Sequence, residues 1–293
     1  MWWGLLGVTA FSFTVPFTRI AVGSLSPLFI ASSRAVIAAA LAAILLSITR
    51  QHWPSKSQWL RLSVVAGGIV IGFPFLTSFA LTTAPASHGA VVIGFLPAAT
   101  AVMAVLRGRE RPSRSFWVFA ILGALATLIF ASLQNGGLGQ LHVSDLLLFG
   151  AVIAAAIGYA EGGLLARELG AWQTVSWALI LSAPLMIVVV IVSVAQEHPV
   201  GTPTAWLALS YLAVVSMYLG FFAWYRGLAI GPMAQVSQTQ LVQPVMSIAW
   251  AALLLHEQLG WATIVGGIAV IACAALAVRT RLNRKPMKRN LGD

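Results

Sequence analysis

Apolar residues dominate this chain in long runs, and short polar segments separate one run from the next. A bilayer core about 30 Å thick is crossed by roughly 20 apolar residues in an α-helix. None of the runs alternates apolar and polar residues as membrane barrel strands do, so helices are expected throughout. The pattern predicts an all-α integral membrane protein with ten transmembrane helices: Trp2–Thr18, Pro27–Thr49, Gln58–Leu81, Ser87–Leu106, Ser115–Leu133, Ser144–Leu165, Trp172–Ala195, Trp206–Tyr225, Met233–Leu255 and Trp261–Val278.

The composition excludes several classes of protein. Of the 293 residues, 59% are hydrophobic and only 8% are charged, whereas an ordinary soluble domain has about 25% charged residues. A soluble enzyme, a secreted disulfide-bonded protein and a disordered chain are therefore excluded. Cys273 is the single cysteine, and the sequence has no Cys/His cluster of the kind that binds a metal. It also has no Gly-rich phosphate loop of the kind found in ATP-driven pumps. We expect no cofactor.

The net charge of +10 is distributed as in a polytopic membrane protein. Of the 17 Lys and Arg residues, 15 lie in or beside the connections after the second, fourth, sixth and eighth runs, or after the tenth. Positive residues collect on the cytoplasmic side of membrane proteins. The distribution predicts a multi-pass protein of the cell inner membrane with both termini in the cytoplasm, and it does not indicate nucleic acid binding.

The chain also contains an internal repeat with a register of 147 residues. Each copy holds five spans, an odd number, so the second copy is expected to be inverted across the membrane. The Arg-rich segment 106–114 then corresponds to segment 253–260, which has no Lys or Arg, as expected for connections on opposite sides. We divide the chain into a first repeat at 1–138, a second at 139–279 and a basic cytoplasmic tail at 280–293. The matching pairs are Trp59/Trp206, Pro85/Pro232, Pro97/Pro244 and Glu110/Glu257.

Several stretches resemble the drug/metabolite transporter superfamily, and specifically its ten-span EamA-like members. The resemblance rests on segment 11–19, on Arg34, on segment 84–87, on Pro97 with the turn at Glu110, and on their counterparts Pro232, Pro244 and Glu257. It implies a transporter built from two five-span repeats, and it covers essentially the whole chain up to Val278. Glu161 departs from the family, which usually has a neutral residue there.

Two charged residues lie inside apolar runs. A guanidinium in a membrane span costs at least about 2.5–3.5 kcal/mol, so Arg34 requires a partner or a wet cavity. It is a candidate contact for a substrate carboxylate or phosphate, or else half of a structural ion pair. Glu161 lies among Gly158, Gly162 and Gly163, where helices approach closely. We predict that Glu161 binds substrate or carries a coupling proton; the alternative is a hydrogen-bonded acid near the cytoplasmic end, with Arg167 close by.

Polar and aromatic residues of other spans complete the candidate substrate site. Gln240 and Gln243 share a helix face in the ninth span, and Ser12 belongs to the first stretch of the resemblance. Tyr218 and Trp177 are candidates for stacking on a substrate, although aromatic residues also collect at membrane interfaces. Structural hydrogen bonding is the alternative for the glutamines.

Prolines and acidic residues near the span ends receive structural interpretations. Pro97 and Pro244 are predicted helix-breaking or hinge positions, because proline removes a backbone hydrogen bond. Glu110 and Glu257 each precede a new helix, so we interpret them as residues that meet the positive end of a helix dipole.

The sequence thus predicts a secondary active transporter, an exporter of small metabolites such as amino acids, that works by alternating access of two inverted repeats. A passive facilitator or channel is the main alternative, and a membrane scaffold or lipid-handling protein is a weaker one. An enzyme is not expected, because Glu161 alone supplies too few chemical groups. We expect the partners to be a small-molecule substrate and the lipid bilayer, with proton coupling through Glu161, in a monomer or homodimer.

Overall fold

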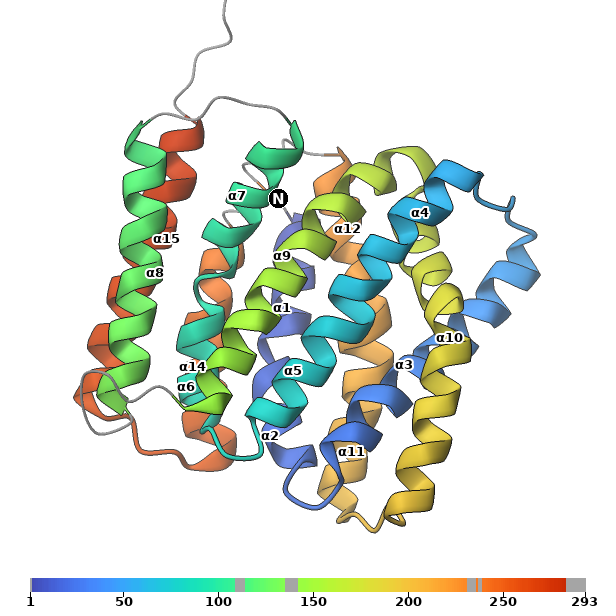
Figure 1. Ribbon diagram of the computed structural model, residues 1–293, viewed down its shortest axis with the longest axis horizontal. Coiled ribbons are helices and arrows are strands. Elements are labelled where there is room, and N and C mark those ends of the chain that lie inside the picture. Colours follow the sequence, from blue (N-terminus) through green and yellow to red (C-terminus); the bar gives the residue numbers. More distant parts are fainter. Residues whose placement is uncertain (1, 109–113, 135–141, 231–235, 237–238, 283–293) are drawn as a thin grey trace, which may run out of the picture.

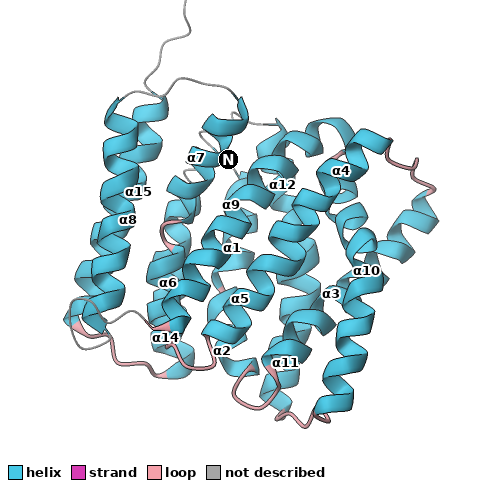
Figure 2. Cartoon of the chain, in the orientation of Figure 1, coloured by secondary structure: helices cyan, strands magenta, loops and turns pink. Residues whose placement is uncertain are grey.

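The computed structural model describes residues 2–108, 114–134, 142–230, 236 and 239–282, and every regular element in these ranges is helical (Figures 1 and 2). The helices are α1 Trp2–Ser12, α2 Thr14–Ala21, α3 Pro27–Thr49, α4 Lys56–Val65, η1 Ala66–Gly72, α5 Phe73–Ala80, α6 Ala86–Ile93, α7 Leu96–Gly108, α8 Arg114–Gln134, α9 Val143–Leu169, α10 Ala171–Gln196, α11 Pro203–Tyr211, η2 Leu212–Leu219, α12 Gly220–Ile230, η3 Thr239–Leu241, α14 Val242–Leu255 and α15 Trp261–Leu282.

Seven continuous or interrupted helices in these ranges are long and apolar enough to cross a membrane. They are Trp2–Ala21, Pro27–Thr49, Lys56–Ala80, Ala86–Arg107, Val143–Leu169, Ala171–Gln196 and Pro203–Ile230. Three shorter apolar stretches, Trp117–Ala126, Thr239–Leu255 and Trp261–Cys273, lie where the sequence predicts the fifth, ninth and tenth spans. The prediction of a helical integral membrane protein is confirmed.

The helices are arranged as one inner group between two outer pairs (Figure 1). Helices α8 and α15 pack on each other at one side of the bundle, and α3 packs along α10 at the other side. Between them α9 crosses the middle of the bundle and contacts α5, α7 and η1. The interior of the bundle is therefore lined mainly by helices other than α8 and α15.

Several spans are interrupted near their middle. The fourth span breaks at Gly94 and Phe95, between α6 and α7, so Pro97 lies in the first turn of α7. Pro244 lies in the first turn of α14, directly after the short 3₁₀ helix η3. Proline is well tolerated in a first helical turn, because its missing N–H has no partner there anyway. Both prolines therefore begin a helix, which agrees with the interpretation that they mark breaks in the spans.

The two breaks lie against each other. A Cβ atom placed on Gly94 would be 3.2 Å from Cβ of Pro244, closer than most side chains approach. Glycine at position 94 allows this close approach because it has no side chain. The interrupted fourth and ninth spans thus meet inside the bundle.

A widened π-helical segment occurs in the third span and again in the eighth. In the third span α4, η1 and α5 follow one another without a break, and α11, η2 and α12 do the same in the eighth. Ile69 in η1 and Ser216 in η2 are 147 residues apart, the register found in the sequence. The π-helix is rare and is frequently found at functional sites, so these segments direct attention to the space between them.

Candidate functional site

A small cavity lies in the middle of the bundle, between the two π-helical segments. The space open to the centre of a water-sized sphere is about 20 Å³, enough for about one water molecule. The residues that line it come from six of the expected spans: Phe11, Thr14, Arg34, Ile69, Phe73, Ala155, Tyr159, Ser216, Phe221 and Gln243. The fourth span supplies no lining residue, and the second span supplies Arg34. In this conformation the cavity has room for a water molecule and not for an amino acid.

Arg34 brings a positive charge into this cavity. Its side chain is buried, with 2% of the residue exposed, and Nη2 donates a long hydrogen bond of 3.4 Å to Oγ of Ser216. Within the described part of the chain, Nε and Nη1 have no hydrogen-bond partner. The guanidinium is therefore buried with most of its donors free.

The hydroxyl groups of Thr14 and Ser216, next to Arg34, are hydrogen-bonded to each other. Oγ1 of Thr14 and Oγ of Ser216 are 2.8 Å apart and share a hydrogen bond. Thr14 begins α2, directly after the interruption of the first span at Phe13, and Ser216 lies in η2. Two irregular places in the backbone thus position the polar groups next to the guanidinium.

Aromatic rings form the rest of the wall. The ring centroid of Phe11 is 4.9 Å from that of Phe221 and 6.2 Å from that of Tyr159, and the Tyr159 and Phe221 centroids are 5.9 Å apart. An apolar enclosure with a few convergent polar groups is typical of small-molecule sites. The arrangement combines one cation, the amide of Gln243 and three hydroxyl-bearing residues, one of which is Tyr159 in the aromatic wall.

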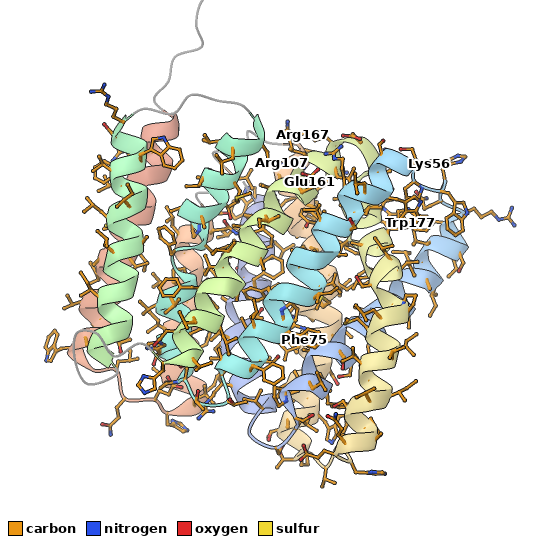
Figure 3. The ribbon with its side chains drawn as sticks, viewed as in Figure 1. Lys56, Phe75, Arg107, Glu161, Arg167 and Trp177 are labelled. Carbon is orange, nitrogen blue, oxygen red and sulfur yellow. The ribbon has the colours of Figure 1, made fainter. Side chains whose placement is uncertain are left out.

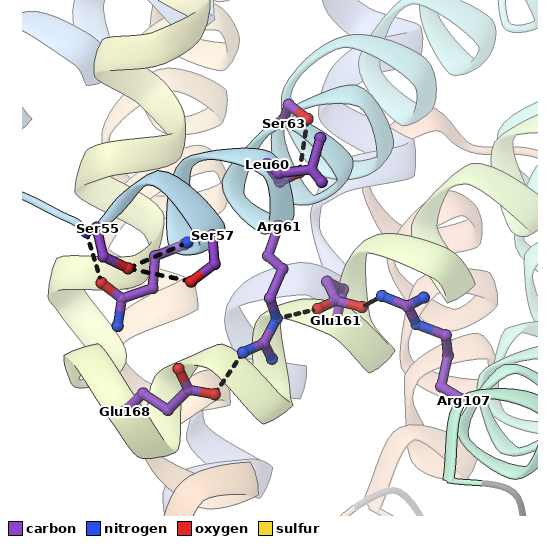
Figure 4. A network of polar contacts seen from close by, with 9 residues as sticks. Ser55, Ser57, Leu60, Arg61, Ser63, Arg107, Glu161 and Glu168 are labelled. Atoms are coloured by element: carbon purple, nitrogen blue, oxygen red, sulfur yellow. Dashed lines mark hydrogen bonds and ion pairs between the residues drawn. The ribbon is translucent and has the colours of Figure 1, made fainter.

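Glu161 lies outside this cavity, in a cluster of ion pairs at one end of the bundle. Its two carboxylate oxygens accept from Nε of Arg61 in α4 and from Nη2 of Arg107 in α7, and Arg61 also pairs with Glu168 (Figure 4). The Glu161 side chain is 2% exposed and that of Arg107 is 50% exposed, so the cluster extends from the interior to the edge. Lys56, Arg107, Glu161 and Arg167 all lie toward this end (Figure 3).

A second polar pair lies near the other end of α9. Nε2 of His88 in α6 is 2.7 Å from Oδ1 of Asp145, and both side chains are buried. Asp145 precedes Glu161 by 16 residues on the same helix, which corresponds to about 24 Å along its axis. The sequence did not indicate this pair, because His88 and Asp145 each lie at the end of an expected span and are 57 residues apart.

Glu257 contacts a helix other than the one that follows it. Its Oε1 accepts from the backbone N–H of Ala86 at 2.7 Å, and its Oε2 accepts from that of Ser87 at 2.9 Å. These groups form the first turn of α6, so the carboxylate lies at the positive end of that helix. The interaction that the sequence predicted is present, but on α6 of the first half. Glu110, the matching residue, lies outside the described residues.

The remaining candidates lie around the cavity without lining it. The hydroxyl of Ser12 donates to the carbonyl of Thr9 and accepts from Nε1 of Trp250, so it holds the end of α1. The amide of Gln240 is buried and has no hydrogen-bond partner in the described part of the chain. Tyr218 shares a hydrogen bond of 2.9 Å with Ser176.

Trp177 lies in a separate place, at the edge of the bundle. Its ring packs against Trp53 and Trp59, with centroid distances of 5.1 and 5.6 Å. It lines a second cavity of about 320 Å³ together with Arg50 and Gln51. The structure therefore brings together Arg34 and Gln243, and it leaves Trp177, Tyr218, Ser12, Gln240 and Glu161 outside the central cavity.

Comparison with known proteins identifies the family. The model of the EamA-like transporter family matches residues 1–132 and again residues 142–279. This chain belongs to the EamA-like transporter family. The two matched segments of this EamA-like transporter are separated by residues 133–141.

Relatives and a solved structure agree with this assignment. The chain is 46% identical over 277 residues to an uncharacterized transporter, YdeK, of Bacillus subtilis (strain 168), covering 94% of this chain and 96% of the relative. It is 27% identical over 258 residues to the aromatic amino acid exporter YddG of Ancylobacter novellus, covering 85% of this chain and 84% of that protein. A solved crystal structure superposes with a TM-score of 0.66 at 18% identity, covering 96% of this chain and 98% of the other, and so shares the fold.

Proposed function

We propose that this EamA-like transporter is a secondary active exporter of small metabolites such as amino acids. In this proposal ten transmembrane helices form two inverted five-helix repeats, at 1–138 and 139–279, in the cell inner membrane with both termini in the cytoplasm. The central cavity is the substrate site, and the two repeats open it alternately to either side. The observation that carries the proposal is the position of that cavity, between the matching π-helical segments η1 and η2.

The interrupted spans support this mechanism. Transporters with inverted repeats bind substrate near the bilayer midplane, where discontinuous helices meet. Here the breaks of the fourth and ninth spans lie in contact, and the first span is interrupted at Phe13, beside the cavity. Such breaks supply the places at which half-helices can tilt.

The two polar clusters on α9 fit the requirement for alternating closure. Arg107 of α7 pairs with Glu161, and His88 of α6 pairs with Asp145, so both halves of the fourth span are joined to α9 at opposite ends. An opening of either side between these spans would separate one of the two pairs. The closed cavity corresponds to a conformation in which both are formed.

Amino acids are proposed as the substrate class because one relative is an aromatic amino acid exporter and because the cavity wall combines polar groups with aromatic rings. Energy coupling by proton exchange through Glu161 is retained as a proposal, since its buried carboxylate joins two helices that would have to separate.

Counterflow in proteoliposomes tests the proposal. Vesicles loaded with an unlabelled amino acid are expected to accumulate the same labelled amino acid transiently, whereas a channel gives no such overshoot. A facilitator gives counterflow but no accumulation when a pH gradient is imposed. A scaffold or lipid-handling protein gives neither result.

The coupling role of Glu161 is tested in the same vesicles. Glu161→Gln is expected to transport without stimulation by the pH gradient. Glu168→Gln serves as the control, because Glu168 pairs with the same arginine, Arg61, but has a more exposed side chain. Unchanged gradient dependence in Glu161→Gln would remove this residue from the coupling role.

A further inference from the structure

We infer that Arg34 is the anion-binding group of the central cavity, so that the solute this protein carries has a carboxylate. The inference deepens the proposed function and rests on it, because it assumes that the cavity is the substrate site. It adds what the cavity recognises: a monocarboxylate with an apolar substituent.

The guanidinium of Arg34 has no anionic partner among the residues that the structure describes. Arginine has five N–H donors and remains charged. Arg34 uses one donor in its 3.4 Å contact with Ser216, and its Nε and Nη1 have no partner among the described residues. A structural ion pair, the alternative that the sequence left open, is not formed with any carboxylate that the structure describes.

Each carboxylate that the structure describes lies in another environment. Asp145 pairs with His88, Glu161 and Glu168 pair with arginines, and Glu257 binds the first turn of α6. Glu197, at the end of α10, is exposed. The described acidic residues are thus engaged elsewhere or face outward: Asp145, Glu161, Glu168, Glu197 and Glu257. No carboxylate in the described part of the chain is thus left to pair with Arg34, and we assign this role to a ligand.

The polar groups around Arg34 match a carboxylate. A guanidinium presents paired N–H groups that match the two oxygens of a carboxylate. The hydroxyls of Thr14 and Ser216 and the amide of Gln243 offer further hydrogen bonds, and Arg34 is the single cationic residue among those that line the cavity. One cation balances a monoanion, whereas a phosphate dianion would leave a net negative charge in an apolar enclosure.

The apolar side of the cavity matches the part of the solute that carries no charge. Phe11, Tyr159 and Phe221 form an aromatic wall next to the polar groups, and Ile69, Phe73 and Ala155 complete the apolar side. Burial of an apolar substituent against this wall would contribute favourable hydrophobic free energy. The cavity therefore fits a carboxylate at Arg34 with an apolar or aromatic group beside it, once its repeats move apart enough to admit one.

The experiment compares solutes with and without a carboxylate. The probes are L-phenylalanine, L-leucine and 3-phenylpropionate, together with L-phenylalaninamide and phenethylamine, which lack the carboxylate. Binding to the purified full chain is measured by the shift in Tm, and transport by counterflow in proteoliposomes. We expect at least one carboxylate probe to raise Tm and to show counterflow, and we expect the amide and the amine to bind at least tenfold more weakly.

Variants of Arg34 provide the second arm. Arg34→Gln is expected to lose tenfold or more of the affinity for the carboxylate probe, and Arg34→Lys to keep part of it, because the ammonium retains the charge but not the paired donors. Arg226→Gln is the matched control, since Arg226 is exposed on α12 and does not line the cavity. The comparison of solutes uses the wild-type chain and so remains decisive if Arg34→Gln fails to fold.

The outcomes separate this inference from the proposed function. Equal binding of L-phenylalaninamide or phenethylamine, unchanged affinity in Arg34→Gln, or no binding of any carboxylate probe would overturn the role of Arg34. Binding that depends on Arg34 and on the carboxylate, but without counterflow, would support the anion site and contradict alternating access. Counterflow of a solute without a carboxylate would support alternating access and contradict the anion site.

Discussion

Ile69 and Ser216 occupy matching positions, 147 residues apart, in the two π-helical segments and line the same cavity. A π-helical turn has one residue more than the hydrogen-bonding pattern of an α-helix requires, so a span that contains one changes the direction of the side chains beyond it. Because both copies carry this feature at the same register, the cavity lies where the two halves meet. A cavity between two matching segments fits the proposed alternating access of the two repeats.

The contact between η1 and α9 depends on a glycine that has no room for a side chain. A Cβ atom on Gly68 would lie 2.4 Å from the carbonyl oxygen of Ala154 and 2.9 Å from the backbone of Gly158. Gly68→Ala is therefore expected to force η1 away from α9 and to destabilise the protein by about 1–3 kcal/mol, as overpacking does elsewhere. The measurement is the Tm of the detergent-solubilised protein, which should fall by several degrees.

The neighbouring glycine provides the control for this prediction. A Cβ on Gly67 meets nothing within 4 Å, and the residue is exposed. Gly67→Ala is expected to leave Tm unchanged or slightly raised, because alanine is the better helix former. Equal Tm values for the two variants would show that the close approach at Gly68 does not limit packing.

The ion pairs of Glu161 are expected to keep one side of the cavity closed. Glu161→Gln leaves Arg61 and Arg107 without their shared buried carboxylate, so that α7 and α9 should separate more readily at this end. A cysteine at Ala155, which lines the cavity, reports the change. With Cys273 replaced by Ser, Ala155→Cys should react several-fold faster with a membrane-impermeant thiol reagent from the cytoplasmic side in the Glu161→Gln background.

The control for this measurement is Glu168→Gln, which removes only the more exposed partner of Arg61 and should leave the labelling rate near that of the parent. A rate that rises equally in both backgrounds, or in neither, would contradict a closing role for the Glu161 cluster.

Glu257 is expected to stabilise α6 from the other half of the chain. Glu257→Ala removes the acceptor of two backbone N–H groups in the first turn of α6, an effect of about 0.5–2 kcal/mol where helix caps have been removed elsewhere. Tm should fall accordingly, while Glu197→Ala, at an exposed position after α10, should not change it. A larger loss for Glu197→Ala would refute the assignment.

The sequence predicted the elements of this fold far better than their contacts. The spans follow from the apolar runs, because a membrane helix has to be apolar along its whole length. Arg34 could be found for the same reason, since a charge inside such a run is conspicuous. That none of the described carboxylates pairs with Arg34 could not be predicted, because it depends on where those residues lie in space.

The partners of Glu161 illustrate the limit. Arg61 and Arg107 are 100 and 54 residues away in the chain, and nothing in the local pattern distinguishes them from Arg167, the nearer basic residue. Similarly, the helix dipole explains Glu257 correctly, yet only the packing of the two halves shows which helix it meets. The π-helical segments carry no pattern of polar residues that would have revealed them.

The proposed inverted arrangement of the repeats predicts on which side of the membrane each of two connections lies. His52 precedes α4, and His198 precedes α11, the matching helix of the second half, and both residues are exposed. The two connections lie at opposite ends of the bundle (Figure 1). In a background with Cys273 replaced by Ser, His52→Cys should be labelled by an impermeant thiol reagent only after the membrane is opened, and His198→Cys should be labelled in intact cells.

The expectation follows from charge, because Arg50 and Lys56 flank the first connection whereas Glu197 begins the second. Repeats of parallel orientation would place both connections on the same side, so labelling of both cysteines in intact cells, or of neither, would exclude the inverted arrangement and with it the alternating opening of the cavity around Arg34.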